Sequence, residues 1–273
     1  MKKWLVLMLV FLLVPVLCAC GGEKPEEELT QPVTIAPVTQ PTTAPVTQPT
    51  EPATTPPTPT EPAHSEFYMA DYTPEQVTEY FEEVVLAVEY TDGTGDASLV
   101  QKWLSPIRYG IYGDPTDEDL AVLEDFFSQL NAVPGFPGIR PAEAGEGEEL
   151  TLSFLNKEDF NAAFSDVVHG EDAFGAVEFW YYTDSNEIYS ARIGYRTDID
   201  QQTRNSVLPE EIVNMLGISD TELREDSIVY QYSNDNLSLS DMDWLILKLL
   251  YDPAISSGAN APVCRIVIEN LYY

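Results

Sequence analysis

The sequence predicts a single α+β domain behind a long N-terminal extension, and three observations support this. The 273-residue chain is 44% hydrophobic, so it can form a core. Residues 66–273 combine segments of alternating polarity with segments of helical spacing, and about 200 residues suffice for one full core. The chain also carries 46 acidic against 13 basic residues, a formal charge of −33. Nucleic acid is therefore excluded as a partner, because a surface that tracks phosphates needs clustered Lys and Arg.

Two helices are expected in the first half of this domain. Thr73 and Gln76 have the spacing of a capping box with Pro74 at the first helical position, and apolar residues then recur every three or four positions. Thr116 precedes an acidic turn and so caps a second helix, whose apolar face ends at Leu130. Both segments are therefore predicted to pack one face against a core.

Alternating or β-prone segments predict the sheet. Residues 103–112 are β-prone despite Pro106, and residues 150, 152 and 154 alternate as in a strand. Residues 177–181 and 187–196 flank a polar break at 183–186, which predicts an antiparallel hairpin. The short stretch 263–268 is expected to be a closing strand. We therefore expect a mixed, twisted sheet.

Two more helices are expected in the second half. Residues 198–216 are helical in pattern up to Gly217, which suits a left-handed C-cap, and Pro209 should kink this helix or begin a new turn. Ser240 caps a last helix that is apolar on nearly every side and stops before Pro253. That helix is predicted to be buried.

The N-terminus indicates export and lipidation. Lys2 and Lys3 precede an apolar run from residue 4 to 17, which is typical of a secretion signal and short for a membrane span. The following Leu-Cys-Ala-Cys-Gly-Gly resembles a bacterial lipobox, which implies a signal peptide at 1–19 and acylation of Cys20; Cys18 fits less well. A signal that merely contains cysteines is the alternative. Membrane attachment would then depend on acyl chains, because anionic lipid repels so acidic a chain.

Residues 20–65 form the expected stalk. They are dense in Pro and Thr, and the heptapeptide at 36–42 recurs unchanged at 44–50. Such a segment cannot pack a core and favours an extended spacer. We expect a domain displayed at the extracellular face of the membrane, in an envelope of the Gram-positive type. Cys264 would remain the unmodified thiol, without a disulfide partner and buried as a small hydrophobe.

The segment from Pro209 to Asp220 carries the motif with the most chemical content. Its spacing resembles the metzincin zinc-peptidase signature H-E-x-x-H-x-x-G-x-x-H. In that resemblance the ligand positions are Glu210, Asn214 and Asp220, the general base is Glu211 and the turn glycine is Gly217. Only the Glu and the Gly of the signature are retained.

Two downstream blocks make the resemblance more specific. Residues 227–230, Ser-Ile-Val-Tyr, resemble the metzincin Met-turn with Val229 in place of methionine, and the helix after Ser240 ends in Leu-Tyr-Asp-Pro. Together with the Glu-Glu segment they are similar to a bacterial lipoprotein family, domain-of-unknown-function family 2927. The resemblance implies a metzincin-like single domain whose zinc-binding histidines have been lost.

The altered motif leaves three interpretations open, namely a catalytic zinc site, a site for a hard cation, and a purely structural role. Zinc prefers imidazole and thiolate ligands, whereas Glu210, Asn214 and Asp220 offer only oxygen or amide donors, closer to what a divalent cation such as Ca²⁺ accepts. Such a site would be weak, so we expect no cofactor, or at most a weakly bound divalent cation. In the third interpretation these residues only favour the helix dipole and make local hydrogen bonds.

Other catalytic chemistry has less support. His169 could serve as a base for a nucleophile, but no G-x-S-x-G turn accompanies it, and Cys264 lies in an apolar pattern. A pair of carboxylates for glycoside hydrolysis stays open, because acids are abundant. In residues 179–182, alternation should direct one aromatic pair into the core and leave the other on the sheet surface.

We therefore expect a cell-surface lipoprotein that binds a peptide or a cell-wall component without catalysis, with an edge strand pairing to an extended peptide. The alternative is a metal-dependent hydrolase with Glu211 as general base and Glu210, Asn214 and Asp220 as ligands. An inert head on a wall-spanning spacer is the third possibility.

Overall fold

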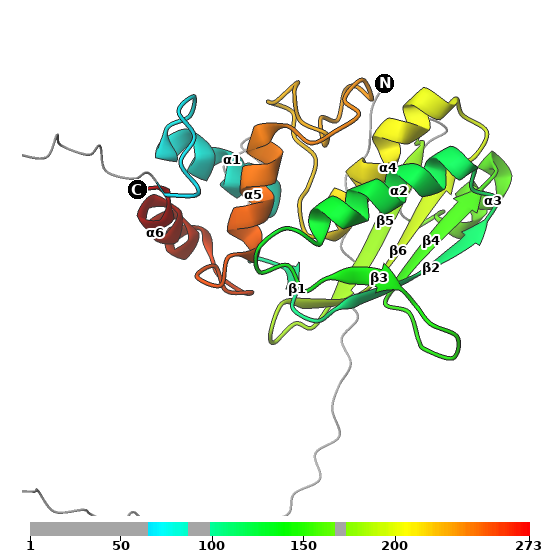
Figure 1. Ribbon diagram of the computed structural model, residues 1–273, viewed down its shortest axis with the longest axis horizontal. Helices are drawn as coiled ribbons and strands as arrows, with labels where there is room; N and C mark the ends of the chain where they lie inside the picture. The colour runs from blue at the N-terminus through cyan, green and yellow to red at the C-terminus, as the bar shows by residue number, and fades with distance from the viewer. Residues whose placement is uncertain (1–64, 87–98, 167–172) are drawn as a thin grey trace, which may run out of the picture. The chain divides into compact units, whose positions relative to one another are not determined.

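A computed structural model describes residues 65–86, 99–166 and 173–273, which all belong to one compact unit (Figure 1). The elements in chain order are α1 (Pro74–Leu86), β1 (Lys102–Trp103), β2 (Ile107–Gly113), α2 (Asp117–Leu130), β3 (Ile139–Pro141), β4 (Leu150–Leu155), α3 (Lys157–Ala163), β5 (Gly175–Tyr181), β6 (Glu187–Arg196), α4 (Gln201–Met215), α5 (Asp241–Tyr251) and α6 (Ala261–Tyr272). Among the described residues, no helix has the length and apolarity needed to cross a membrane.

The strands form one mixed sheet of mostly parallel strands. Its order is β1-β6-β4-β2-β3, and every pair along this path is parallel. β5 is the exception, because it pairs antiparallel with β6 through the turn predicted at 183–186. The path therefore ends in two short strands, the two-residue β1 and the three-residue β3, while the seven-residue β5 lies off the path and pairs with β6 alone among the described strands.

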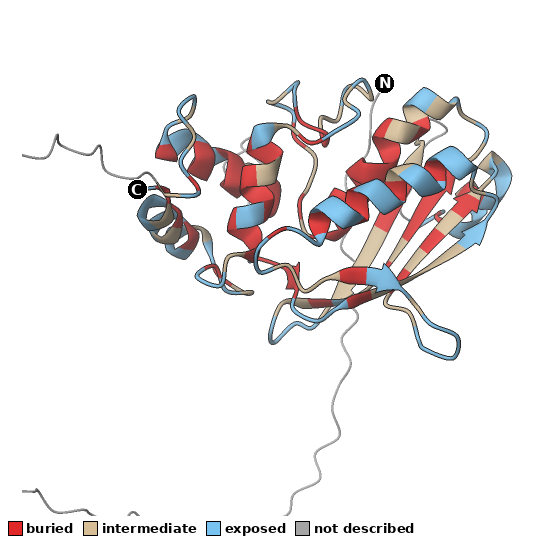
Figure 2. Cartoon of the chain, in the orientation of Figure 1, coloured by how far each residue is buried: buried red, intermediate tan, exposed pale blue. Residues whose placement is uncertain are grey.

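Helices cover the two faces of the sheet unequally. Tyr195 of β6 donates a hydrogen bond to the Leu208 carbonyl of α4, whereas a side chain at the adjacent Gly194 would overlap with Phe164. Because successive strand residues face opposite sides, α4 and the end of α3 lie on opposite faces. α2 packs against α4 on the first face, and its outward side is exposed (Figure 2).

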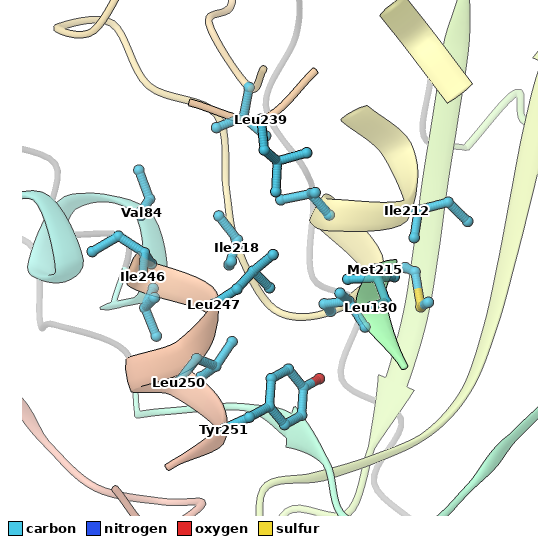
Figure 3. Packing of buried hydrophobic residues seen from close by; sticks show 14 of the residues in the cluster. Val84, Leu130, Ile212, Met215, Ile218, Leu239, Ile246, Leu247, Leu250 and Tyr251 are labelled. Carbon is cyan, nitrogen blue, oxygen red and sulfur yellow. The ribbon is translucent and has the colours of Figure 1, made fainter. Parts of the chain in front are cut away.

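A second helical group, α1, α5 and α6, shares its hydrophobic core with α4. Figure 3 shows Ile212 and Met215 of α4 in the same cluster as Leu247 and Leu250 of α5. Lys102 reaches this group from β1, and its ammonium group donates hydrogen bonds to the carbonyls of Leu250 and Ile255. Its burial lowers its pKa to about 8. The sheet and the C-terminal helices are thus joined through one continuous core.

Most of the predicted local signals are confirmed. Thr116 and Ser240 each form a capping box with an Asp at the third helical position, and Thr73 exchanges backbone–side-chain bonds with Gln76. α5 is buried over most of its length. Gly217 has φ +97°, as a left-handed C-cap requires. The expected mixed sheet and the hairpin of β5 and β6 are also present.

The closing strand predicted at 263–268 is wrong, because these residues belong to helix α6. The buried side chains are Cys264, Ile268 and Tyr272, spaced by four, and Asn260 caps the helix ahead of Pro262. A short apolar run is compatible with the two-residue repeat of a strand and with the 3.6-residue repeat of a helix, and this one is helical. Consequently α5 is not the last helix. α3 and β3 were not predicted, although Asn156 is a recognisable N-cap for α3.

Gly217→Ala is expected to lower the free energy of unfolding by about 1–3 kcal/mol, because a side chain there would be strained at positive φ and would overlap with the Gln101 carbonyl. Urea denaturation measures this difference. Gly147→Ala is the matched control, because a Cβ at that position meets no atom within 4 Å. Equal effects of the two substitutions would show that the turn after α4 is not constrained as described.

Candidate functional site

The candidate site is built on α4, which is buried although it carries several polar residues. Its first turn is capped by Asp200, which accepts a hydrogen bond from the Thr203 amide. Arg204 pairs with Asp119 at 2.9 Å, with side chains only 7% and 0% exposed. A buried ion pair must be well matched, because an unpaired charge there is costly. The start of α4 is thus fixed to the start of α2.

Helix α4 continues without a break through Pro209. Pro209 lacks the N–H that continues the helical ladder, and the carbonyl just before it, that of Leu208, accepts the Tyr195 hydroxyl at 3.1 Å. Burial, together with the negative charges of Glu211, Asp119 and Glu210, raises the pKa of Tyr195. The phenol therefore stays protonated and remains a donor. The structure shows a continuous helix from Gln201 to Met215 rather than a new helix at Pro209.

The end of α4 is held by the sheet. The indole Nε1 of Trp103, in β1, donates to the Met215 carbonyl at 3.0 Å. Gly217 then reverses the chain closely past the backbone of Gln101. These contacts fix the end of α4, and with it the start of the segment that carries Asp220.

The motif residues lie on the buried surface of α4. Glu210, Glu211 and Asn214 are 4%, 8% and 7% exposed. Glu210 and Asn214 share one face because they are four residues apart, and Glu211 is three residues from Asn214. The Glu211 carboxylate lies against Gly175 at the start of β5, where any side chain would overlap with it. Gly175 therefore makes room for Glu211.

Of the three expected ligand residues, the structure joins two directly. Asn214 Nδ2 donates to Asp220 Oδ1 at 3.1 Å, so the turn at Gly217 does bring residue 220 back to the helix. Glu210 Oε2 instead accepts from Asn234 Nδ2 at 3.0 Å. Asn214 Oδ1 is buried and has no hydrogen-bond partner among the described residues. In the described part of the chain, the Asn214 amide oxygen is thus an unsatisfied acceptor.

Metal-binding geometry is not evident in this part of the chain. Among residues 65–86, 99–166 and 173–273, no three His, Cys, Asp or Glu side chains gather as metal ligands would. The oxygen and amide groups that are present suit a hard cation better than zinc, and three of them would bind Ca²⁺ weakly. The roles predicted for Glu210, Glu211, Asn214 and Asp220 remain hypotheses.

The segment that resembles a Met-turn is organised by Asp243. Asp243 Oδ1 accepts from the Ser227 hydroxyl at 2.7 Å and from the Tyr80 hydroxyl at 3.0 Å. Its Oδ2 accepts from the backbone N–H of Ile228 at 3.1 Å and of Ser240 at 2.9 Å. Burial, and then the charge of Asp243, raises the pKa of Tyr80, which keeps the phenol as a donor. One carboxylate therefore connects α1, α5 and residues 227–228.

Of the cysteines and histidines singled out in the sequence, only Cys264 lies in the described part of the chain. His169, His64, Cys18 and Cys20 lie outside the described residues. Cys264 is free and fully buried, as expected, and burial raises the pKa of its thiol to about 11. Its thiolate is therefore disfavoured, which argues against a nucleophile.

The prediction for the aromatic residues 179–182 is confirmed for the inward pair, whereas of the outward pair only Tyr182 is exposed and Trp180 is half-buried. Phe179 and Tyr181 pack against the main core. Tyr182 is half exposed, and its ring stacks on that of Tyr189 at 4.4 Å between centroids. The alternation of side chains along a strand, which directs Phe179 and Tyr181 inward, could be predicted from the sequence.

Two further residues of the site were not predicted. Asn234 binds Glu210 from a loop 24 positions away, and no local signal marks it. Ser206 lies one turn before Glu210 on α4, and its buried hydroxyl has no hydrogen-bond partner among the described residues. Helical spacing from Glu210 could have indicated Ser206.

The fold and site define a mixed α/β domain in which a polar, buried helix lies beside an antiparallel edge strand. A family model described as "Protein of unknown function (DUF2927)" matches residues 74–270, and the chain belongs to this family. Comparison with curated proteins found no match.

Asp243→Ala is expected to lower the free energy of unfolding by about 3 kcal/mol, because several buried donors lose their acceptor at once. Thermal and urea denaturation measure the loss. Asp241→Ala is the control on the same helix, since Asp241 is exposed and contributes about 1 kcal/mol or less through the helix dipole. Similar losses in both variants would contradict the assigned role of Asp243.

Proposed function

We propose that this protein is a cell-surface lipoprotein whose metzincin-like domain binds an extended peptide along β5 without hydrolysing it. The observation that carries the proposal is the outer edge of β5 beside α4, where the outward backbone groups of Val177 and Phe179 have no hydrogen-bond partner among the described residues. The alternative, a metal-dependent hydrolase with Glu211 as base, has less support because the motif helix offers no imidazole.

β5 differs from the short strands β1 and β3 at the ends of the strand order in a way that favours binding at β5. β3 has only three residues and ends in Pro141, which are features that protect an edge from pairing with another chain. β5 has seven residues, Gly-Ala-Val-Glu-Phe-Trp-Tyr, without proline and with a single charge. Native proteins rarely leave such an edge unprotected, so a bound strand is a reasonable explanation for it.

The hydrogen-bond register indicates which groups of β5 face outward. The Arg196 amide donates to the Phe174 carbonyl at 3.0 Å. Every second residue after Phe174, which means residues 176, 178 and 180, therefore directs its backbone N–H and C=O groups toward β6. In an antiparallel pair the intervening residues direct their N–H and C=O groups to the other side. Val177 and Phe179 are such residues, and their backbones have no partner outside β6 in the described chain. They could pair with a peptide.

The position of α4 supports the metzincin-like interpretation. Glu211 lies against Gly175 at the start of β5, and Gly217 lies near Ile188, which pairs with Tyr181 at its end. The motif helix therefore runs alongside the edge strand in the same direction (Figure 1). In the resemblance drawn from the sequence, that edge strand pairs with an extended peptide, a mode that requires no metal.

Binding is testable with a library of fluorescein-labelled octapeptides and the full chain in detergent micelles, followed by fluorescence polarisation. Peptides that bind should lose affinity by roughly tenfold or more when alternate backbone amides are N-methylated, because strand addition depends on main-chain bonds. N-methylation at the intervening amides serves as the matched control. Val177→Pro should weaken binding as well, because it removes an outward donor while leaving the ladder to β6 intact.

Two results would contradict this proposal. Equal effects of both N-methylation patterns would show that the peptide does not add as a strand. A stoichiometric metal ion, lost in Asp220→Ala, together with peptide hydrolysis abolished by Glu211→Gln, would support the hydrolase instead.

Anchoring through Cys20 is a separate proposal that rests on the lipobox-like Leu-Cys-Ala-Cys-Gly-Gly. Cys20→Ser should abolish incorporation of labelled palmitate and release the protein from the membrane fraction, because an acidic chain depends on acyl chains for attachment. Cys18→Ser is the control and should leave both unchanged. Loss of labelling in Cys18→Ser but not in Cys20→Ser would show that Cys18 is the acylated residue.

A further inference from the structure

The unsatisfied acceptor at Asn214 distinguishes this site from an ordinary buried helix. The Asn214 side chain is more than nine-tenths buried, and its Nδ2 donates to Asp220 Oδ1 at 3.1 Å. Its Oδ1 is enclosed and accepts no hydrogen bond among the described residues. A buried acceptor without a donor lowers stability, so the position is better adapted to something other than folding.

The surroundings of Asn214 favour a positively charged donor. Asp220 is in contact with the amide, and Glu210 lies one turn earlier on the same face of α4. Glu211, three residues before Asn214 on the same helix, is a further buried carboxylate. The negative charge in this region affects Tyr195, whose pKa is raised mainly by burial and further by Glu211 and Glu210. The formal charge of −33 on the chain also attracts cations and cationic peptides.

An organic ammonium group fits this arrangement better than a metal ion. Ca²⁺ takes six to eight oxygen ligands, and the described residues contain no group of three acidic, His or Cys side chains arranged as metal ligands. A lysine ammonium carries three N–H donors and is satisfied by about three acceptors. Its compact shape also suits converging oxygens, whereas a guanidinium needs a planar, two-point partner.

We propose that Asn214 and Asp220 form a lysine pocket, which takes the ammonium group of a lysine in the bound peptide. This inference rests on the proposed binding along β5, because α4 lies beside that strand and Glu211 contacts its first residue. Asp220 is the partly exposed member of the group and therefore marks the side from which the lysine enters. The ligand's own charge would thus occupy the position that the metzincin resemblance assigns to a metal ion.

The test uses fluorescein-labelled peptides that bind the full chain and differ at one position, which is lysine, arginine or norleucine. Norleucine has nearly the length of lysine without its charge. At low salt the lysine peptide should bind roughly tenfold or more tighter than the norleucine peptide, and this preference should shrink at high salt. Asn214→Leu and Asp220→Asn should remove the preference.

Thermal denaturation of the same variants separates a binding role from a structural one. Asn214→Leu should melt at the same or a higher temperature, because it removes an unsatisfied buried acceptor. Gln202→Leu, at an exposed position of the same helix, is the control and should retain the preference for lysine.

The outcomes distinguish this inference from the function on which it rests. Equal binding of the lysine and norleucine peptides would overturn the lysine pocket while leaving strand addition intact. Failure of every peptide in the library to bind would overturn both. A preference for lysine that persists in Asn214→Leu, with a lower melting temperature, would show that Asn214 is structural and would overturn the pocket.

Discussion

The burial of α4 is the constraint on which the rest of the structure depends. A helix that carries Arg, Glu and Asn cannot lie inside a domain unless its polar groups find partners. Arg204 pairs with Asp119 at its start, and Trp103 binds the Met215 carbonyl at its end. Between them Tyr195 bonds to the carbonyl that precedes Pro209. These contacts fix both the position and the rotation of α4, and so they decide which side chains face β5.

Asp243 has the corresponding role for the segment that follows α4. Its carboxylate accepts from Tyr80 of α1, from Ser227 and from the Ile228 amide, and it also closes the capping box of α5. Because all of these donors are buried, the charge cannot be removed without leaving several of them unsatisfied. The loop that carries Asn234 to Glu210 is therefore tied to the C-terminal helices, and the site is built from elements far apart in the sequence.

The chemistry of the site follows from what α4 offers. Without histidine, the motif positions supply carboxylates and an amide, which bind zinc poorly but accept hydrogen bonds well. The structure adds a strand edge with outward backbone groups and an amide oxygen that lacks a donor among the described residues. In the proposed function a peptide uses both, the edge through its backbone and the acceptors through a charged side chain. Peptide recognition would then depend on the same carboxylate and amide groups that make the motif a poor zinc site.

The sequence by itself determined the elements whose signals are local. The capping residues Thr116 and Ser240, the turn between β5 and β6, and Gly217 at positive φ each act within a few residues, so their patterns predict structure directly. The spacing of Glu210, Glu211 and Asn214 likewise placed them on one helix.

Only the tertiary structure decided the rest. Residues 263–268 fit a strand as well as a helix, and packing of Cys264 and Ile268 with the core selected the helix, where Arg265 pairs with Glu82 of α1. Asn234 reaches Glu210 across a loop, and Asn214 bonds to Asp220 while its own oxygen stays unpaired. Such contacts depend on how distant segments meet in three dimensions, and no local pattern records that.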